Sequence, residues 1–241
     1  MALQLIVGIS YLATVSAVWA QVPAQQLGER VESLTRFDHV YVTGNIDLKL
    51  VQSTDQVSNE LRVRAERLDL EAVEDVLVEQ VDRVLFIDAP RDGRYQVELV
   101  VGRLKELVFD GTGEITGEGI EGDGLLIEGR GDGDFDLRKL SVRDLVVVGT
   151  GQTRFRFSGT ARHQSIELAG ANIYAAHELQ STTSSVSASG QNDLVLQTSE
   201  LLDVVVEGSG IVRYQGAPRV HQTIVGSGKV LRLPEVRTTT L

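Results

Sequence analysis

A short glycine motif, Gly-x-Gly or Gly-x-Asn, recurs from residue 111 onward and constrains the fold more than any other feature of the chain. Its first and third residues are Gly111 and Gly113, Gly129 and Gly131, Gly149 and Gly151, Gly170 and Asn172, Gly190 and Asn192, Gly208 and Gly210, and Gly226 and Gly228. Successive motifs begin 18 to 21 residues apart. A repeat of this length is typical of a solenoid, in which each repeat stacks on its neighbour.

Asparagine replaces the third residue of the motif in two repeats, at Asn172 and Asn192. Apart from glycine, asparagine is the residue that best tolerates the left-handed region of the backbone. We therefore expect every motif to form the same tight bend, with both asparagines in a left-handed conformation.

Apolar and polar residues alternate ahead of each motif. The residue two positions before the first glycine is apolar in all seven repeats: Phe109, Ile127, Val147, Leu168, Ala188, Val206 and Ile224. The residue four positions before is apolar in six of seven: Leu107, Leu125, Leu145, Ile166, Val186 and Val204, with Gln222 as the exception. A period of two indicates a strand that buries one face.

One repeat cannot bury its apolar face alone, but stacked coils about 4.8 Å apart close a continuous core. The sequence therefore predicts an all-β fold, a single-stranded right-handed parallel β-helix with coils of 18–21 residues. The handedness follows from the twist of strands and the rule for parallel crossovers. We expect a rigid rod of about nine or ten coils.

The rest of the chain divides around this solenoid. Residues 1–20 are predicted to be a signal peptide, because an uncharged apolar run ends in Val18-Trp19-Ala20 with small residues at the cleavage positions; an uncleaved membrane anchor is the alternative. We expect a polar lead over 21–35, one solenoid domain over 36–233 and a flexible tail over 234–241. Residues 36–100 are interpreted as opening coils with wider loops, and Leu68–Val73 as one helical turn.

Charge and cysteine content exclude several classes of function. The formal net charge is −11, from 34 acidic and 23 basic residues. This balance repels the phosphate backbone of nucleic acids and disfavours anionic lipid surfaces. The chain has no cysteine, which excludes disulfides, thiol catalysis and cysteine-based metal sites.

Several segments together suggest a family. They are the opening Phe37-Asp-His-Val-Tyr-Val-Thr-Gly44, the following Val51-Gln-Ser53, the repeated Gly-Ser-Gly and Gly-Thr-Gly bends, the stretch Gly208-Ser-Gly-Ile-Val-Arg-Tyr-Gln-Gly-Ala-Pro218, and Gly226-Ser-Gly-Lys-Val230. Over residues 36–233 the chain resembles the putative auto-transporter adhesin head GIN domain family, a bacterial domain of unknown function. The resemblance implies a secreted or lipid-anchored bacterial β-helix with an adhesin-like role, and it supplies no catalytic residues.

Three carboxylates alternate along one strand at Asp132, Asp134 and Asp136 and therefore share a face. They would suit Ca²⁺, or the acid and base of a carbohydrate-active enzyme. The calcium-binding nonapeptide does not fit their spacing, and the nearby arginines form no coherent cluster in sequence. We therefore expect a solvated acidic turn, with no metal, no cofactor and no enzymatic activity.

The function expected from these observations is that of a non-enzymatic, exported binding module. It would present polar, Ser/Thr-rich ladders such as Gln180–Ser189 to an unknown protein or carbohydrate ligand. The location would be periplasmic, cell-surface or extracellular, without stable membrane insertion once the signal is cleaved. A carbohydrate-active enzyme and a purely structural envelope component are the alternatives. The sequence leaves the ligand and the oligomeric state open.

Overall fold

A computed structural model describes residues 29–234, apart from 54, 56–58 and 66–72. The predicted signal peptide, the tail beyond residue 234 and nearly all of the predicted helical turn lie outside the described residues. The described residues contain no helix and form one 14-stranded sheet.

The strands are β1 (Glu29–Ser33), β2 (His39–Gln52), β3 (Glu60–Ala65), β4 (Leu77–Val81), β5 (Val84–Asp88), β6 (Tyr95–Val101), β7 (Glu106–Glu118), β8 (Glu121–Gly151), β9 (Arg154–Gly170), β10 (Ile173–Gly190), β11 (Asp193–Gly208), β12 (Ile211–Gln215), β13 (Arg219–Gly226) and β14 (Lys229–Arg232).

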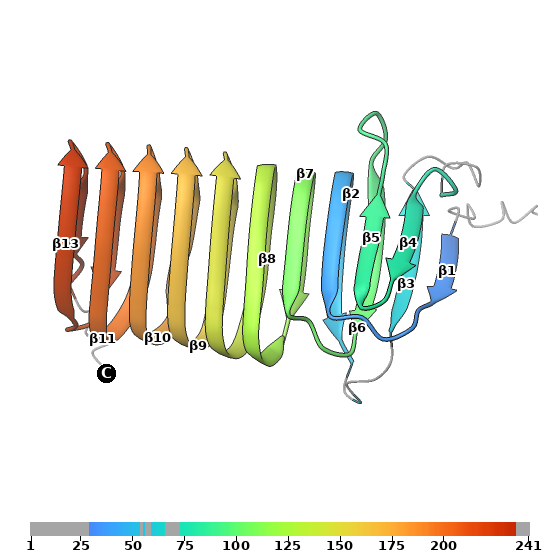
Figure 1. Ribbon diagram of the computed structural model, residues 1–241, viewed down its shortest axis with the longest axis horizontal. Coiled ribbons are helices and arrows are strands. Elements are labelled where there is room, and N and C mark those ends of the chain that lie inside the picture. The colour runs from blue at the N-terminus through green and yellow to red at the C-terminus, as the bar shows by residue number, and fades with distance from the viewer. Residues whose placement is uncertain (1–28, 54, 56–58, 66–72, 235–241) are drawn as a thin grey trace, which may run out of the picture.

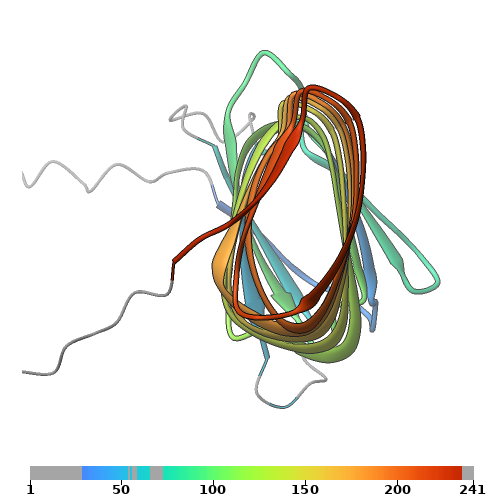
Figure 2. The ribbon, with the colours of Figure 1, turned by 90° about the vertical axis from the view of Figure 1, so that its left-hand side faces the viewer.

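The sheet winds into a β-solenoid, as the repeat predicts. Parallel coils stand side by side along the long axis of the molecule (Figure 1), and a view along that axis shows a closed oval with the core inside (Figure 2). Within β2, residues 39–43 pair with β5 on one wall, and residues 46–52 pair with β6 on the other. The bend between the two walls falls at Gly44, and we call its equivalents in all coils the first bend.

The solenoid has about 6 turns, fewer than the nine or ten expected from the sequence. The difference lies between β2 and β7, where β3, β4, β5 and β6 do not form successive regular coils. Strands β5 and β6 pair with one edge of β2, and β7 pairs with its other edge. Strands β1, β3 and β4 then add antiparallel pairs at this end of the rod. Strand β1 lies within the segment 21–35.

In two coils, the glycine that stacks on its neighbours is not the first glycine of the sequence motif. The glycines that occupy the first bend are Gly44, Gly111, Gly131, Gly151, Gly170, Gly190, Gly208 and Gly226. Gly129 and Gly149 are not in this ladder: Gly129 pairs with Phe109, and Gly149 pairs with Leu168. The alignment of these two motifs by their first glycine was therefore wrong by two residues.

Gly129 and Gly149 face the core, where they make room for phenylalanine rings. A Cβ atom on Gly129 would lie 2.9 Å from the ring of Phe135, and one on Gly149 would lie 2.8 Å from the ring of Phe155. The two rings stack with centroids 5.0 Å apart. A shift of two residues keeps every side chain on its own face of the strand. The alternation therefore predicted the burial of Ile127, Val147 and Leu168 correctly although the register was displaced, whereas Ile224, in the last coil, is 38% exposed.

The two asparagines are not in the left-handed conformation that we expected, since neither has a positive φ. Both side chains are buried inside the first bend. The amide N–H of Thr153 donates to Oδ1 of Asn172 at 3.0 Å, and both the backbone N–H and Nδ2 of Asn172 donate to Oδ1 of Asn192, at 3.0 and 2.9 Å. The role of asparagine here is to provide its side-chain amide, which accepts hydrogen bonds from backbone N–H groups buried inside the bend.

This amide ladder predicts the effect of Asn172→Ala. The substitution leaves the buried N–H of Thr153 without its acceptor, which costs about 2 kcal/mol of unfolding free energy. The exposed bend residue Gln191 provides the control, because Gln191→Ala should change stability by less than about 0.5 kcal/mol. Urea unfolding of both variants measures the difference, and equal stability of the two would contradict the ladder.

The glycine ladder makes a second prediction. Gly190 has a φ of +96°, and a Cβ atom there would lie 2.4 Å from the carbonyl oxygen of Gly170. Gly190→Ala should therefore lower stability by at least about 2 kcal/mol. Nothing lies within 4 Å of a Cβ atom on Gly124, so Gly124→Ala is the matched control and should be close to neutral. Thermal and urea unfolding measure both, and tolerance of Gly190→Ala would show that the coils do not approach this closely.

Candidate functional site

A groove of about 600 Å³ crosses the outside of the solenoid at the second bend of the coils, opposite the first bend. It lies across β8, β9, β10 and β11 and reaches the turn that follows β12. We call it the polar groove, and its lining consists of Val142, Thr160, Arg162, Gln180, Ser181, Thr182, Gln197, Thr198, Ser199, Gly216 and Ala217. Apart from Arg162, its polar side chains are all hydroxyls and amides.

The groove forms where the length of the coil changes. From Gly170 to Gly190 the coil advances 20 residues, but from Gly190 to Gly208 it advances only 18. The first bend stays in register, so the difference is absorbed at the second bend. There the pairing of β10 with β11 shifts between Ala176 and Gln180 and again between Ser181 and Thr183. Such irregularities bend a strand and redirect its side chains.

Three hydroxyls at the base of the groove hydrogen-bond to backbone carbonyl groups of the bulge. Ser181 Oγ donates to the carbonyl of Gln197 at 2.7 Å, Thr198 Oγ1 to that of Thr182 at 3.2 Å, and Ser199 Oγ to that of Ser181 at 3.2 Å. Ser181 and Thr198 are also buried. These contacts hold the irregular backbone in one conformation, so the groove has a rigid base.

The side chains at the rim are available to a ligand. Thr160 and Gln180 are exposed, and Thr182 and Gln197 are half-buried. Within the described residues none of these four side chains makes a hydrogen bond. Arg162 is exposed at the same rim and has no ion-pair partner among the residues that the structure describes. The groove thus offers hydroxyls, amides and one guanidinium, with no carboxylate in its lining.

The aspartates singled out in the sequence lie on another part of the surface. Asp134 accepts a hydrogen bond from Arg154 at 3.0 Å and forms an ion pair with Arg156 at 2.8 Å, and Asp136 pairs with Arg138 at 2.6 Å. Asp132 is exposed beside the first bend. No group of three or more side chains suited to a metal ion occurs among the described residues.

A hollow between β2, β7 and β8 does bring carboxylates and cations together, and it includes Glu118, Asp136 and Arg138. The hydrogen bonds from Arg138 lower the pKa of Asp136, and the hydrogen bond from Lys139 lowers the pKa of Glu118. A glycosidase needs one carboxylic acid with a raised pKa to protonate the leaving group. Lowered pKa values give carboxylates that stay ionised, which does not suit that role.

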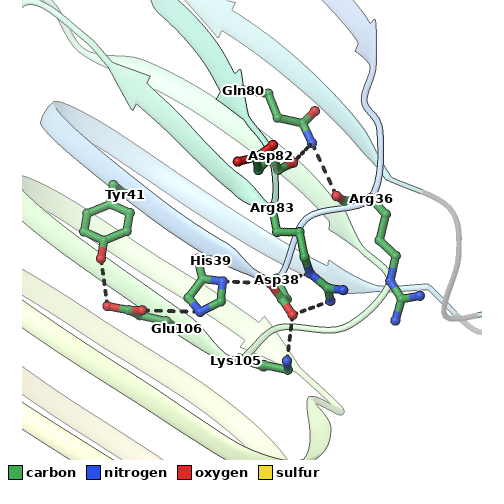
Figure 3. A network of polar contacts seen from close by, with 9 residues as sticks. All are labelled: Arg36, Asp38, His39, Tyr41, Gln80, Asp82, Arg83, Lys105 and Glu106. Carbon is green, nitrogen blue, oxygen red and sulfur yellow. Dashed lines mark hydrogen bonds and ion pairs between the residues drawn. The ribbon is translucent and has the colours of Figure 1, made fainter.

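A third polar site, at the start of β2, contains the buried carboxylate of Asp38 (Figure 3). Arg83 binds it through Nη2 and through Nε, the latter at 3.1 Å, and Lys105 Nζ lies 2.9 Å away. Burial raises the pKa of Asp38, but the hydrogen bonds from Arg83 and Lys105 and the charge of His39 outweigh burial and hold the pKa well below its usual range.

The contacts of Asp38 indicate a structural role. Its backbone N–H donates to the carbonyl of Arg83 at 3.1 Å, and its carbonyl accepts from the N–H of Lys105 at 2.8 Å, so that it joins the starts of β2, β5 and β7. The neighbouring His39 lies between two carboxylates, with Nδ1 2.7 Å from Asp38 and Nε2 3.7 Å from Glu106. Both ring nitrogens face acidic groups of the protein. We therefore assign this network to the assembly of the coils.

Comparison with known proteins identifies the family. The model of the family described as "Putative auto-transporter adhesin, head GIN domain" matches residues 36–218. The chain belongs to this family. The resemblance found in the sequence is thereby confirmed, and the head GIN domain accounts for the opening coils as well as for most of the repeats. Comparison with curated proteins finds no match.

Solved structures share the head GIN fold. A putative adhesin from Bacteroides fragilis has a TM-score of 0.79 and 22% sequence identity, over 88% of this chain and 99% of that one. A putative lipid binding protein from Parabacteroides distasonis has a TM-score of 0.65 and 18% identity, over 86% of this chain and 96% of that one. A putative adhesin from Parabacteroides merdae gives a TM-score of 0.62 with 18% identity, over 86% of this chain and 96% of that one. At these identities the likeness shows the fold alone.

The residues predicted from the sequence enter the candidate site only in part. The glycine motifs lie at the first bend, away from the polar groove. Of the predicted polar ladder Gln180–Ser189, only Gln180, Ser181 and Thr182 line the groove. Sequence reasoning missed Arg162 and Gln197. The drop in spacing from 20 to 18 residues was a signal that the coils become irregular near them.

The Asp38 network predicts a pH dependence of stability. Because the pKa of Asp38 is lowered in the folded state, its contribution is present above the unfolded pKa of about 4 and is lost as the pH falls toward the folded value. Asp38→Asn should cost about 2 kcal/mol at pH 7, and the difference from the wild type should shrink below about pH 4. Urea unfolding at pH 7, 4 and 3 measures this.

The exposed Asp132 provides the control, since Asp132→Asn should follow the wild type at every pH. A constant difference between wild type and Asp38→Asn over the whole range would show that the carboxylate charge is not what stabilises this junction.

Proposed function

We propose that this head GIN domain is a non-enzymatic, exported, adhesin-like module that binds a carbohydrate in the polar groove. The observation that carries the proposal is a set of four hydroxyl and amide side chains, Thr160, Gln180, Thr182 and Gln197, which surround a hydrogen-bonded base and make no hydrogen bond with any residue that the structure describes. A sugar presents hydroxyl groups that both donate and accept, and threonine and glutamine side chains do the same. The two surfaces are chemically matched.

The rigidity of the groove supports binding. Its residues lie on paired strands, and the base hydroxyls are already engaged with backbone carbonyls. A ligand therefore orders few protein groups when it binds, which lowers the entropic cost of association. A groove open along several coils suits an extended chain of sugar residues, as an adhesin at a bacterial surface or envelope would encounter.

Other assignments have less support. The carboxylates that a glycoside hydrolase would use are ion-paired, and the pKa values of Glu118 and Asp136 are lowered. One structural neighbour is described as a lipid binding protein, but the polar groove has a hydroxyl and amide lining that does not suit an acyl chain. Export rests on the predicted signal peptide over residues 1–20 and on the adhesin family. Within the described residues there is no helix with the length and hydropathy needed to cross a membrane.

A glycan array probed with the purified chain tests the function. We expect binding to a subset of glycans, weakened at least about tenfold in a Gln180→Ala/Gln197→Ala variant, because two hydrogen bonds to the ligand are lost. Gln191→Ala, which changes an exposed glutamine at the first bend, is the matched control and should bind like the wild type.

The same glycans should be recovered intact. Release of reducing sugar would favour the enzyme, whereas retention of a protein partner in a pull-down without any glycan binding would replace the carbohydrate by a protein ligand. Absence of both kinds of partner would leave a structural envelope component.

A further inference from the structure

We infer that the polar groove selects an acidic sugar, with the carboxylate of the ligand on Arg162. This inference rests on the proposed function and specifies the class of carbohydrate. Arg162 is the one cation in the lining of the groove, and no carboxylate shares that lining. A ligand that carries a negative charge among its hydroxyl groups would complement this arrangement.

Most arginines in the described part of the chain are ion-paired, whereas Arg162, like Arg36 and Arg219, is not. Along the walls of the solenoid, Arg94 binds Asp47, Arg138 binds Asp136, and Arg213 binds Asp193. Arg162 has an exposed side chain and no ion pair with any described residue, in a chain with 34 acidic residues against 23 basic ones. Its guanidinium therefore has no hydrogen-bond or ion-pair partner within the described part of the chain.

The residues around Arg162 place that partner within reach of the rim. Ala161 is buried, so Thr160 and Arg162 point outward from the same face of β9. In the neighbouring coil Gln180 pairs with Thr160 and Thr183 pairs with His163, which sets Thr182 beside Arg162 at the coil spacing of about 4.8 Å. The planar guanidinium can bind a carboxylate through two parallel hydrogen bonds. The ring oxygen and hydroxyl groups of a uronic or sialic acid bound in this way would then lie next to the hydroxyls of Thr160 and Thr182.

Among the residues that the structure describes, no carboxylate forms an ion pair with Arg162. Asp144 and Asp203 line the adjacent hollow, where Arg143 lies 2.9 Å from Asp144 and His221 lies 3.0 Å from Asp203. Glu200 follows Ser199 but is exposed outside the lining of the groove. The net charge of −11 repels anions at long range, so attraction has to be local. This favours a sugar with single carboxylates over a densely charged polyanion.

Pairs of sugars that differ in charge test the inference. The probes are galacturonate with its carboxyl methyl ester, and sialyllactose with its carboxyl methyl ester, titrated calorimetrically into the purified chain. We expect at least one acidic member to bind about tenfold or more tightly than its neutral counterpart. Arg162→Gln should abolish this preference, so that the affinity for the acidic member falls to within about twofold of that for its neutral counterpart. Arg162→Lys should restore part of it, since lysine keeps the charge but not the fork.

Arg91→Gln is the control, because Arg91 is an exposed arginine between β5 and β6, outside the groove. Equal affinity for acidic and neutral members, or an acidic preference that survives Arg162→Gln, overturns the inference. Binding of neutral sugars that depends on Gln180 and Gln197 would still uphold the proposed function. Failure of every sugar to bind, on the array and in these titrations, would overturn both. Circular dichroism and unfolding of each variant show that the fold is retained.

Discussion

The close approach of backbones at the first bend is the constraint on which the rest of the structure depends. The glycine of one coil contacts the carbonyl group of the glycine in the coil before it, and the following residue donates a hydrogen bond to that same carbonyl. These bonds run from Ala171 to Gly151 at 2.9 Å, from Gln191 to Gly170 at 2.7 Å and from Ser227 to Gly208 at 2.9 Å. A Cβ atom in this ladder would overlap with backbone. The ladder thereby fixes the register of each coil on the next.

Because the first bend is the same in every coil, the coils differ from one another in two places, the core and the second bend. Inside the solenoid, Phe135 and Phe155 fill the space left by inward-facing glycines, and two coils later the amides of Asn172 and Asn192 satisfy the bend from within. At the second bend the coils differ in length, and the bulges that absorb the difference form the polar groove. The regular first bend provides a rigid scaffold, and the irregular second bend gives this repeat fold a specific surface.

The sequence predicted the solenoid correctly because its two signals have direct physical causes. Glycine recurs where backbones touch, and aliphatic residues such as Ile127 and Val147 recur where side chains enter the core. The same signals could not fix the register in two coils, since Gly129 and Gly131 both satisfy the pattern and a two-residue shift preserves the facing of every side chain. They also gave the wrong reason for Asn172, whose role depends on a contact with Asn192 twenty residues away.

By itself, then, the amino-acid sequence determined the class of fold, the approximate coil length and most of the buried aliphatic residues, because all of these are periodic properties of a single strand of chain. The family followed from particular segments of the sequence. The tertiary structure decided which glycines stack, how β5 and β6 are placed beside β2, and which polar side chains meet in the groove. Those features depend on where neighbouring coils come to lie against one another, and Arg162, Thr182 and Gln197 are brought together by stacking across coils and by the bulge between them.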